Sequence, residues 1–166
     1  MRSNRLNTAS FSRAANVLDV DDVATLRSRY EHCFGCGPAN PIGLHLDGFT
    51  IHGDQVTAPF TPRAEYAGFE GTLHGGIVAT ALDEISAWSA MFAHGVLVFT
   101  ARLDIRYRSQ ARSDDRFEMR GRVTERRGRR LVIDGQMASD GAVVAESSGL
   151  FIVAQDLTAE LELRTS

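Results

Sequence analysis

One acidic residue, Asp83, stands in the middle of an apolar stretch and is the side chain best placed to do chemistry. The stretch from 77 to 94 contains no Lys or Arg, so no such cation close in sequence can neutralise the carboxylate. A carboxylate removed from bulk water is costly unless it is hydrogen-bonded or used in a reaction. Asp83 is therefore a candidate general base or nucleophile. The alternative is a structural acid that is hydrogen-bonded to the backbone or to a Ser or Thr.

A glycine-rich turn precedes the apolar stretch and could supply the complementary group. It contains Gly68, Gly71, His74, Gly75 and Gly76. A helix that begins here leaves free N–H groups in its first turn, and a glycine lets a ligand approach them closely. The Gly75 N–H is thus a candidate donor to a carbonyl oxygen, unless this glycine only makes a tight turn.

Two neighbours of these residues have less certain roles. His74 lies nine residues before Asp83, which would put the two on opposite sides of a single helix. They can act together only if His74 precedes the helix or if two chains share one site. A structural role for His74 in the turn and a contact with the carbonyl group both stay open. Glu84 points about 100° away from Asp83, so we expect Glu84 at a helix edge or an interface.

The spacing of apolar residues predicts a long helix that carries Asp83. Its broad apolar face consists of Ile77, Val78, Ala81, Leu82, Ile85, Trp88 and Phe92. The opposite side consists of small residues, namely Ala79, Ser86, Ala87 and Ala90. A helix with so few charges must be largely buried, and it ends at Gly95.

Strands are predicted on both sides of this helix. Residues 43–51 and 54–60 alternate and form a hairpin with a turn at 52–54. After the helix the apolar period changes to two, which predicts four strands with short connections at 97–107, 117–123, 131–137 and 143–153. The strand at 97–107 should bury one face, and strict alternation puts Thr100 on its other, polar face. Short connections favour antiparallel neighbours, so we predict an α+β fold with one curved sheet against one helix.

Composition is consistent with one domain in 166 residues. We expect a leader over 1–30, disordered over 1–18 and with a short helix at 19–30, then a domain over 31–155 and an acidic tail over 156–166. The net charge of −3 argues against nucleic-acid binding, and no segment approaches the ~20 apolar residues of a membrane span. We therefore expect a cytoplasmic protein without a nucleic-acid or membrane partner.

The two cysteines form the pattern Cys33-x-x-Cys36, with His32 and His45 nearby. Such spacing can indicate a zinc or redox site. The loop has no second cysteine pair, and His32 is adjacent to Cys33, which is awkward for a tetrahedral site. We expect no metal here and interpret the thiols as small apolar groups in a packed loop.

Two motifs and the order of elements resemble a known family, over roughly residues 33–153. The first motif is Gly71-Thr72-Leu73-His74-Gly75-Gly76, with Asp83 nine residues after the histidine. The second is the opening loop Cys33-Phe34-Gly35-Cys36-Gly37-Pro38-Ala39-Asn40-Pro41-Ile42-Gly43-Leu44. With the order β-β-α-β-β-β-β, these motifs resemble the hotdog-fold acyl-CoA thioesterases, and in particular their phenylacetate-pathway branch.

The resemblance implies hydrolysis of an acyl-CoA thioester to a free acid and coenzyme A. In that family the glycine amide of one subunit faces the acid of the other, so Gly75 and Asp83 would meet across a homodimer, or a homotetramer built from two dimers. Thr100 matches a position where relatives often have a hydroxyl that holds the attacking water. Gly68 departs from relatives that carry an Asn at this position. No cofactor is expected, because coenzyme A is part of the substrate.

Several residues are expected to bind the substrate. Arginines of the turn at 126–130 could hold the coenzyme A phosphates, with Arg106, Arg108 and Arg112 as other candidates, although charged turns are often only solvated. The substrate-binding set is Gly76, Glu84, Arg106, Arg108, Arg129 and Arg130. The alternative function is a non-catalytic hotdog protein that binds acyl-CoA or an acyl carrier, and the sequence leaves the acyl group open.

Overall fold

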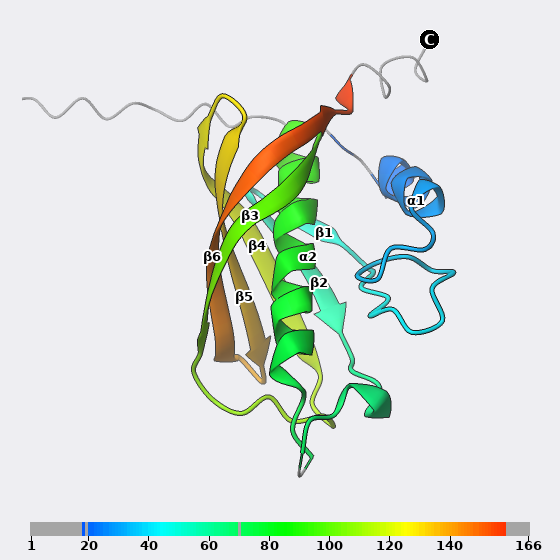
Figure 1. Ribbon diagram of the computed structural model, residues 1–166, viewed down its shortest axis with the longest axis vertical. Helices are drawn as coiled ribbons and strands as arrows, with labels where there is room; N and C mark the ends of the chain where they lie inside the picture. The colour runs from blue at the N-terminus through cyan, green and yellow to red at the C-terminus, as the bar shows by residue number, and fades with distance from the viewer. Residues whose placement is uncertain (1–17, 19, 70, 159–166) are drawn as a thin grey trace, which may run out of the picture.

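A single long helix, α2 (Gly75–His94), lies along one antiparallel sheet in this computed structural model, which describes residues 18, 20–69 and 71–158 (Figure 1). The six strands lie in the order β1-β2-β4-β5-β6-β3. Their bounds are β1 Thr50–His52, β2 Gln55–Phe60, β3 Val96–Tyr107, β4 Phe117–Arg127, β5 Arg130–Ser139 and β6 Ala142–Asp156. The predicted α+β class and the element order are confirmed, and a curved antiparallel sheet around one central helix is the hotdog fold.

The ends of α2 are set by residues that the sequence singles out. His74 caps the N-terminus, where its Nδ1 accepts a hydrogen bond from the Gly76 N–H at 2.9 Å. Gly95 ends the helix in the left-handed region at φ 61°, which glycine adopts without a steric penalty, and its N–H donates to the Met91 carbonyl. The predicted apolar face is buried, except that Ile77 is half-buried.

Glycines of the sheet allow α2 to pack closely on its small-residue side. Gly121 of β4 and Gly135 of β5 are paired neighbours. A Cβ at Gly121 would lie 2.3 Å from the Ser89 Oγ and 2.8 Å from the Ile85 carbonyl oxygen. Any larger residue there would force helix and sheet apart, so the serines and alanines of α2 match glycines opposite them.

The first predicted strand is shorter than expected, because β1 begins at Thr50 rather than at residue 43. Residues 43–49 form an extended loop instead. The N–H groups of Leu44 and Leu46 donate to the carbonyls of Phe34 and Gly35 at 2.7 and 2.9 Å. Both leucines are buried. Their alternation thus reflects packing against the preceding loop, whereas the hairpin turn at Gly53, with φ +68°, is as predicted.

The strand β3 lies at the edge of the sheet and pairs only with β6 among the strands described. We predicted one buried face for this strand, but that is wrong for the single chain, in which Phe99 is 72% and Tyr107 53% exposed. The free edge of β3 is twelve residues long and carries exposed aromatic rings. Natural proteins usually cover an edge of this kind.

The predicted short helix is confirmed as α1 (Val20–Arg29). Leu18, Val23 and Leu26 are buried in the same core cluster as Trp88 of α2. A 3₁₀ turn, η1 (Ala64–Tyr66), precedes the glycine-rich turn. The predicted disordered leader falls almost wholly on residues 1–17, and most of the acidic tail on 159–166, which lie outside the described residues. No helix in the described part of the chain is long and apolar enough to cross a membrane.

Candidate active site

Asp83 and Thr100 meet between α2 and β3. The Thr100 Oγ1 donates a hydrogen bond to the Asp83 Oδ1 at 2.6 Å. Asp83 is half-buried and Thr100 is exposed, so the pair is open to solvent on one side. A charge-assisted hydrogen bond of this length orients the carboxylate and leaves its second oxygen available for water or substrate.

A bulge in β3 turns Thr100 toward the helix, and this corrects our prediction that Thr100 lies on the polar face. Thr100 pairs with Phe151 and Arg102 pairs with Leu150, so Ala101 is an extra residue without a partner of its own. One extra residue shifts the alternation of side chains by one position. The Thr100 side chain therefore lies on the same face of the sheet as that of Phe151. Phe151 is fully buried in one core cluster with Ala90 of α2.

The N-terminus of α2 presents a free donor at Gly75. The Gly76 N–H is bonded to the His74 ring, and the Ile77 N–H donates to the His74 carbonyl at 2.9 Å. Within the described residues the Gly75 N–H has no hydrogen-bond acceptor. Gly75 is exposed and combines this N–H with the positive end of the helix dipole. Gly75 therefore offers the donor that the sequence predicts, whereas the Gly76 N–H is already used.

Tyr107, which sequence reasoning missed, also contacts Gly75. Its hydroxyl donates to the Gly75 carbonyl at 2.8 Å from the far end of β3. The only sequence signal was its place at the end of an alternating strand, and that signal does not distinguish a positioning role from packing. The hydrogen bond orients the peptide unit that follows Gly75 and so fixes the start of the helix.

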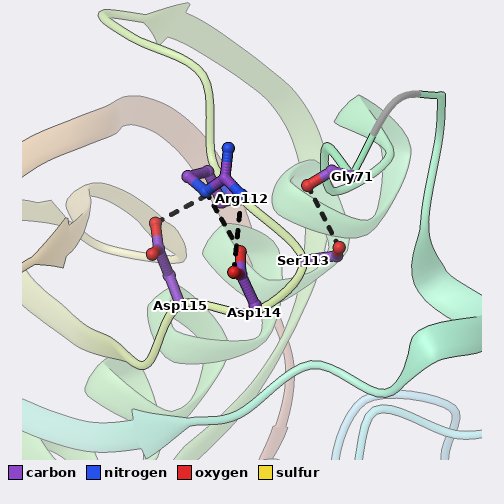
Figure 2. Close-up of polar contacts among 5 residues, drawn as sticks. All are labelled: Gly71, Arg112, Ser113, Asp114 and Asp115. Carbon is purple, nitrogen blue, oxygen red and sulfur yellow. Dashed lines mark hydrogen bonds and ion pairs between the residues drawn. The ribbon is translucent and has the colours of Figure 1, made fainter.

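The loop after β3 secures the glycine-rich turn from the other side. The N–H and Oγ of Ser113 both donate to the Gly71 carbonyl, at 2.8 and 3.0 Å, as Figure 2 shows for the side chain. Arg112 bonds Asp114 within the same loop, at 3.1 Å from Nε to Oδ1 (Figure 2). The Leu73 N–H donates to the Ala111 carbonyl at 2.7 Å. These contacts make the entry to α2 a rigid support for Gly75.

A cavity of about 180 Å³ opens beside Gly75. Its walls are mostly apolar and include Phe69, Leu73, Val78, Ala111, Val144 and Ala145. Such a lining suits an apolar group, and Gly75 at its edge would meet a polar atom attached to that group.

The single chain does not bring Gly75 and Asp83 together. They are eight residues apart on one helix, which separates them by about 12 Å along its axis. His74, as the N-cap residue, lies at the Gly75 end. One chain therefore presents a free N–H donor at Gly75 and, at another place, a carboxylate with its hydroxyl partner.

The predicted phosphate-binding arginines lie away from this cavity in the single chain. Arg106 lines a polar hollow of about 630 Å³ on the face of the sheet that points away from α2, and Arg108 forms an ion pair with Glu146. Arg129 donates to the Val153 carbonyl at 2.8 and 3.2 Å, and Arg130 is exposed. Arg129 lies in the β4–β5 turn and Arg130 begins β5. Figure 1 shows this turn at the same end of the molecule as the C-terminal end of α2.

Glu84 points into the opening loop rather than toward the cavity beside Gly75. Its Oε1 accepts a hydrogen bond from the Trp88 Nε1 at 3.0 Å, and its Oε2 lies 3.9 Å from the Cys33 Sγ. Burial and the neighbouring Cys33 raise the pKa of Glu84 to about 7. The grouping of Glu84 with the cysteines was not visible in the sequence, because 51 residues separate it from Cys33.

The sequence model of the thioesterase superfamily matches residues 70–146, from the glycine-rich turn into β6. Together with the fold, this match confirms the predicted resemblance to the hotdog-fold thioesterase superfamily. The finer resemblance to the phenylacetate-pathway branch stays a prediction. No curated protein matches the chain.

Several solved structures are similar to this chain in fold. The protein RHA08564, described as a thioesterase superfamily protein, is 22% identical with a TM-score of 0.68, over 80% of this chain and 74% of that one. A hypothetical thioesterase from Streptococcus pneumoniae TIGR4, solved with coenzyme A, is 20% identical with a TM-score of 0.59, over 62% and 83%. The protein smu.793 from Streptococcus mutans UA159, bound to acetyl-CoA, is 18% identical with a TM-score of 0.61, over 66% and 91%.

Proposed function

We propose that this protein hydrolyses an acyl-CoA thioester to a free acid and coenzyme A. The observation that carries the proposal is the Thr100–Asp83 hydrogen bond of 2.6 Å, in a chain that also has a free helix-terminal N–H at Gly75. Hydrolysis of a thioester needs a base or nucleophile and a donor for the carbonyl oxygen. Asp83 and Gly75 are the residues of this chain that fit these two roles.

The likeness to relatives that bind coenzyme A supports the choice of substrate. Coenzyme A and acetyl-CoA are the ligands named for the two streptococcal proteins. The S. pneumoniae protein has also been solved with an aspartate and, separately, a threonine replaced by alanine. These are the residue types that meet at Asp83 and Thr100.

The reaction requires the thioester carbonyl oxygen to accept a hydrogen bond from the Gly75 N–H. Negative charge that develops on the carbonyl oxygen is then stabilised by this donor and by the helix dipole. In one route Asp83 takes a proton from water while the water oxygen attacks the carbonyl carbon. In the other route Asp83 attacks directly to form an anhydride, which water then opens. Both break the C–S bond and release coenzyme A as a thiol.

The active unit in this proposal is a homodimer, in which the Gly75 of one chain faces the Asp83 of the other. The open edge of β3, with Phe99 exposed next to Thr100, is the surface that a second copy would cover. A second copy would also supply what one chain lacks, because Gly75 and Asp83 are too far apart on the same helix. A homotetramer of two such dimers remains part of the proposal, and a cytoplasmic location is its expected setting.

The cavity beside Gly75 is assigned to the acyl group or the adjoining thioester end. Its apolar walls suit such a group, and Gly75 at its edge meets the carbonyl. The arginines at 129 and 130 stay the candidates for the coenzyme A phosphates, across the dimer, and Arg106 and Arg108 are alternatives. His74 supports this arrangement as the helix cap.

Replacement of Asp83 tests the function directly. We expect Asp83→Asn to lower kcat by roughly 10²–10⁴ with little change in KM, because the loss falls on the transition state. Release of free thiol from a panel of acyl-CoAs is the measurement, and the melting temperature should be kept. The matched control is Glu84→Gln on the next residue, which should reduce activity much less. A wild-type protein that binds acyl-CoA but releases no thiol would instead support the non-catalytic binder.

A further inference from the structure

Two thiols and a carboxylate gather at the opening loop, apart from the Asp83–Thr100 pair. The ligand atoms of Cys33, Cys36 and Glu84 all lie within 4.8 Å of one another. Cys33 and Glu84 are partly buried and Cys36 is buried. Asp83 is the neighbour of Glu84 in sequence, but its carboxylate faces Thr100 instead. The cluster therefore belongs to the contact between the opening loop and α2.

The spacing of these atoms matches a tetrahedral metal centre. Bonds of about 2.3 Å from zinc to sulfur and about 2.1 Å to oxygen put two such ligands about 3.6–3.8 Å apart. The Cys33 Sγ and Glu84 Oε2 are 3.9 Å apart. The other pairs lie within 4.8 Å, so shifts of up to about 1 Å would bring the three donors onto one ion. The C-x-x-C spacing is also the one in which two thiolates of a turn bind the same zinc ion.

The loop is held in shape before any ion binds. Arg27 donates to the Cys36 carbonyl at 3.0 and 3.2 Å, and the Gly37 N–H donates to the Cys33 carbonyl at 2.9 Å. A Cβ at Gly35 would lie 2.0 Å from the Glu84 Oε2, so only glycine lets the carboxylate approach this close to the loop. Such preorganisation lowers the cost of bringing three ligands together.

Glu84 is also oriented by a neighbour of its own. The Trp88 indole N–H donates to the Oε1 and leaves the Oε2 directed at the thiols. This is the arrangement in which a second layer of hydrogen bonds fixes a metal ligand. Trp88 in turn stacks on Phe49, with ring centroids 4.5 Å apart, and is buried in the core.

The carboxyl group of the cluster is not neutralised by an ion pair in the part of the chain that the structure describes. Within the described residues, no basic side chain forms an ion pair with Glu84.

The geometry points to a zinc-binding site formed by Cys33, Cys36 and Glu84, with water as the fourth ligand. Thiolates select zinc over the harder magnesium and calcium ions. Cys33 is only half-buried, so water can reach the fourth position. The ion would join the opening loop to α2 and fasten the N-terminal segment to the domain. This proposal departs from our expectation that the cysteines are only packing groups, and it does not depend on the proposed hydrolysis.

Metal analysis of the protein purified with a reductant and without chelator tests this site. We expect one zinc ion per chain after dialysis. Chelator-treated protein titrated with Co²⁺ should develop a thiolate-to-cobalt charge-transfer band, and Zn²⁺ should abolish it and raise the melting temperature. Reduced protein that retains no zinc and gives no such band with Co²⁺ would overturn the proposal. Protein that is isolated with a Cys33–Cys36 disulfide and, after reduction, still binds neither Zn²⁺ nor Co²⁺ would also overturn the proposal.

Single substitutions identify the ligands. Cys33→Ser and Cys36→Ser should each weaken the charge-transfer band and the zinc affinity, and Glu84→Gln should keep the band but lower the affinity at least about 10-fold. His32→Ala is the matched control, because this imidazole is adjacent to Cys33 yet exposed, and it should bind zinc like the wild type. Equal zinc affinity in Glu84→Gln and the wild type would remove Glu84 from the site.

Discussion

The Thr100 hydroxyl reaches the Asp83 carboxylate because β3 contains one residue more than β6 opposite it. Without the bulge at Ala101, the alternation fixed by Leu103 and Ile105 would point Thr100 away from α2. With the bulge, the Thr100 Oγ1 lies 2.6 Å from the Asp83 Oδ1. Bulges are common next to active sites because they re-aim a side chain without changing the fold. This one couples the edge strand to the carboxylate that we propose as catalytic.

Removal of the Thr100 hydroxyl should slow the reaction. Thr100→Val keeps the shape of the side chain and deletes the hydrogen bond to Asp83. Hydrogen bonds to charged groups contribute about 1.5–3 kcal/mol, so kcat should fall roughly 10–100-fold. Steady-state thiol release measures this effect. Thr100→Ser restores the donor and should recover most of the activity; a serine variant as slow as the valine variant would exclude a role for the hydroxyl.

A methyl group at Gly75 should block access to its N–H. The added Cβ would lie 3.6–3.8 Å from the Tyr107 ring and hydroxyl, an ordinary contact, so Gly75→Ala should fold. The methyl lies beside the N–H, and we expect kcat/KM to fall at least about 10-fold, since loss of one such donor costs about 10²–10³ in other enzymes. Gly68→Ala is the control, with its nearest contact at 3.5 Å. Equal activity of Gly75→Ala and the wild type would refute the assignment.

The assembly can be tested at the exposed edge of β3. Light scattering should give at least twice the 18.1 kDa mass of one chain. Phe99→Glu places a charge on a 72% exposed ring that a partner would bury, and it should both dissociate the dimer and abolish activity. Ile42→Glu, at a residue that is 68% exposed on the opening loop, should do neither. A fully active monomer would contradict a site shared between chains.

The buried carboxyl of Glu84 should make the stability of the metal-free protein depend on pH. Burial raises its pKa from the ordinary 4.5 to about 7. Between these values the folded state binds more protons than the unfolded state, so the free energy of unfolding falls as pH rises from about 4.5 to about 7. The fall should be on the order of 1–3 kcal/mol.

A double variant isolates this contribution, because the lowered pKa of Cys33 acts in the opposite direction. In a Cys33→Ser background, Glu84→Gln should remove the fall, as measured by urea unfolding across the pH range. Glu31→Gln, at an exposed acid of the same loop, should leave the fall in place. Identical pH profiles with and without Glu84 would show that its carboxyl does not titrate as described.

The amino-acid pattern by itself determined the long helix, its buried face and the series of antiparallel strands. Helical and alternating periods are local properties of the sequence. The positions of Ile85 and Trp88 therefore predict a core helix, and Gly95 predicts its end. His74, Gly75 and Asp83 could be picked out for the same reason, since their types and spacing are visible along the chain. The strand predicted over residues 43–49 is wrong, because the alternating Leu44 and Leu46 pack against the opening loop and do not pair in the sheet.

Only the tertiary structure decided where the side chains meet. The extra residue at Ala101 has no signature in the alternation, because a bulge is defined by the partner strand. Tyr107 reaches Gly75 over 32 residues of sequence, and Glu84 reaches Cys33 over 51. Contacts of this kind depend on how the sheet curves around α2, which places a strand end against a helix start and a loop against a helix edge. Local patterns do not show such contacts, because they depend on side chains that pack across elements far apart in the sequence.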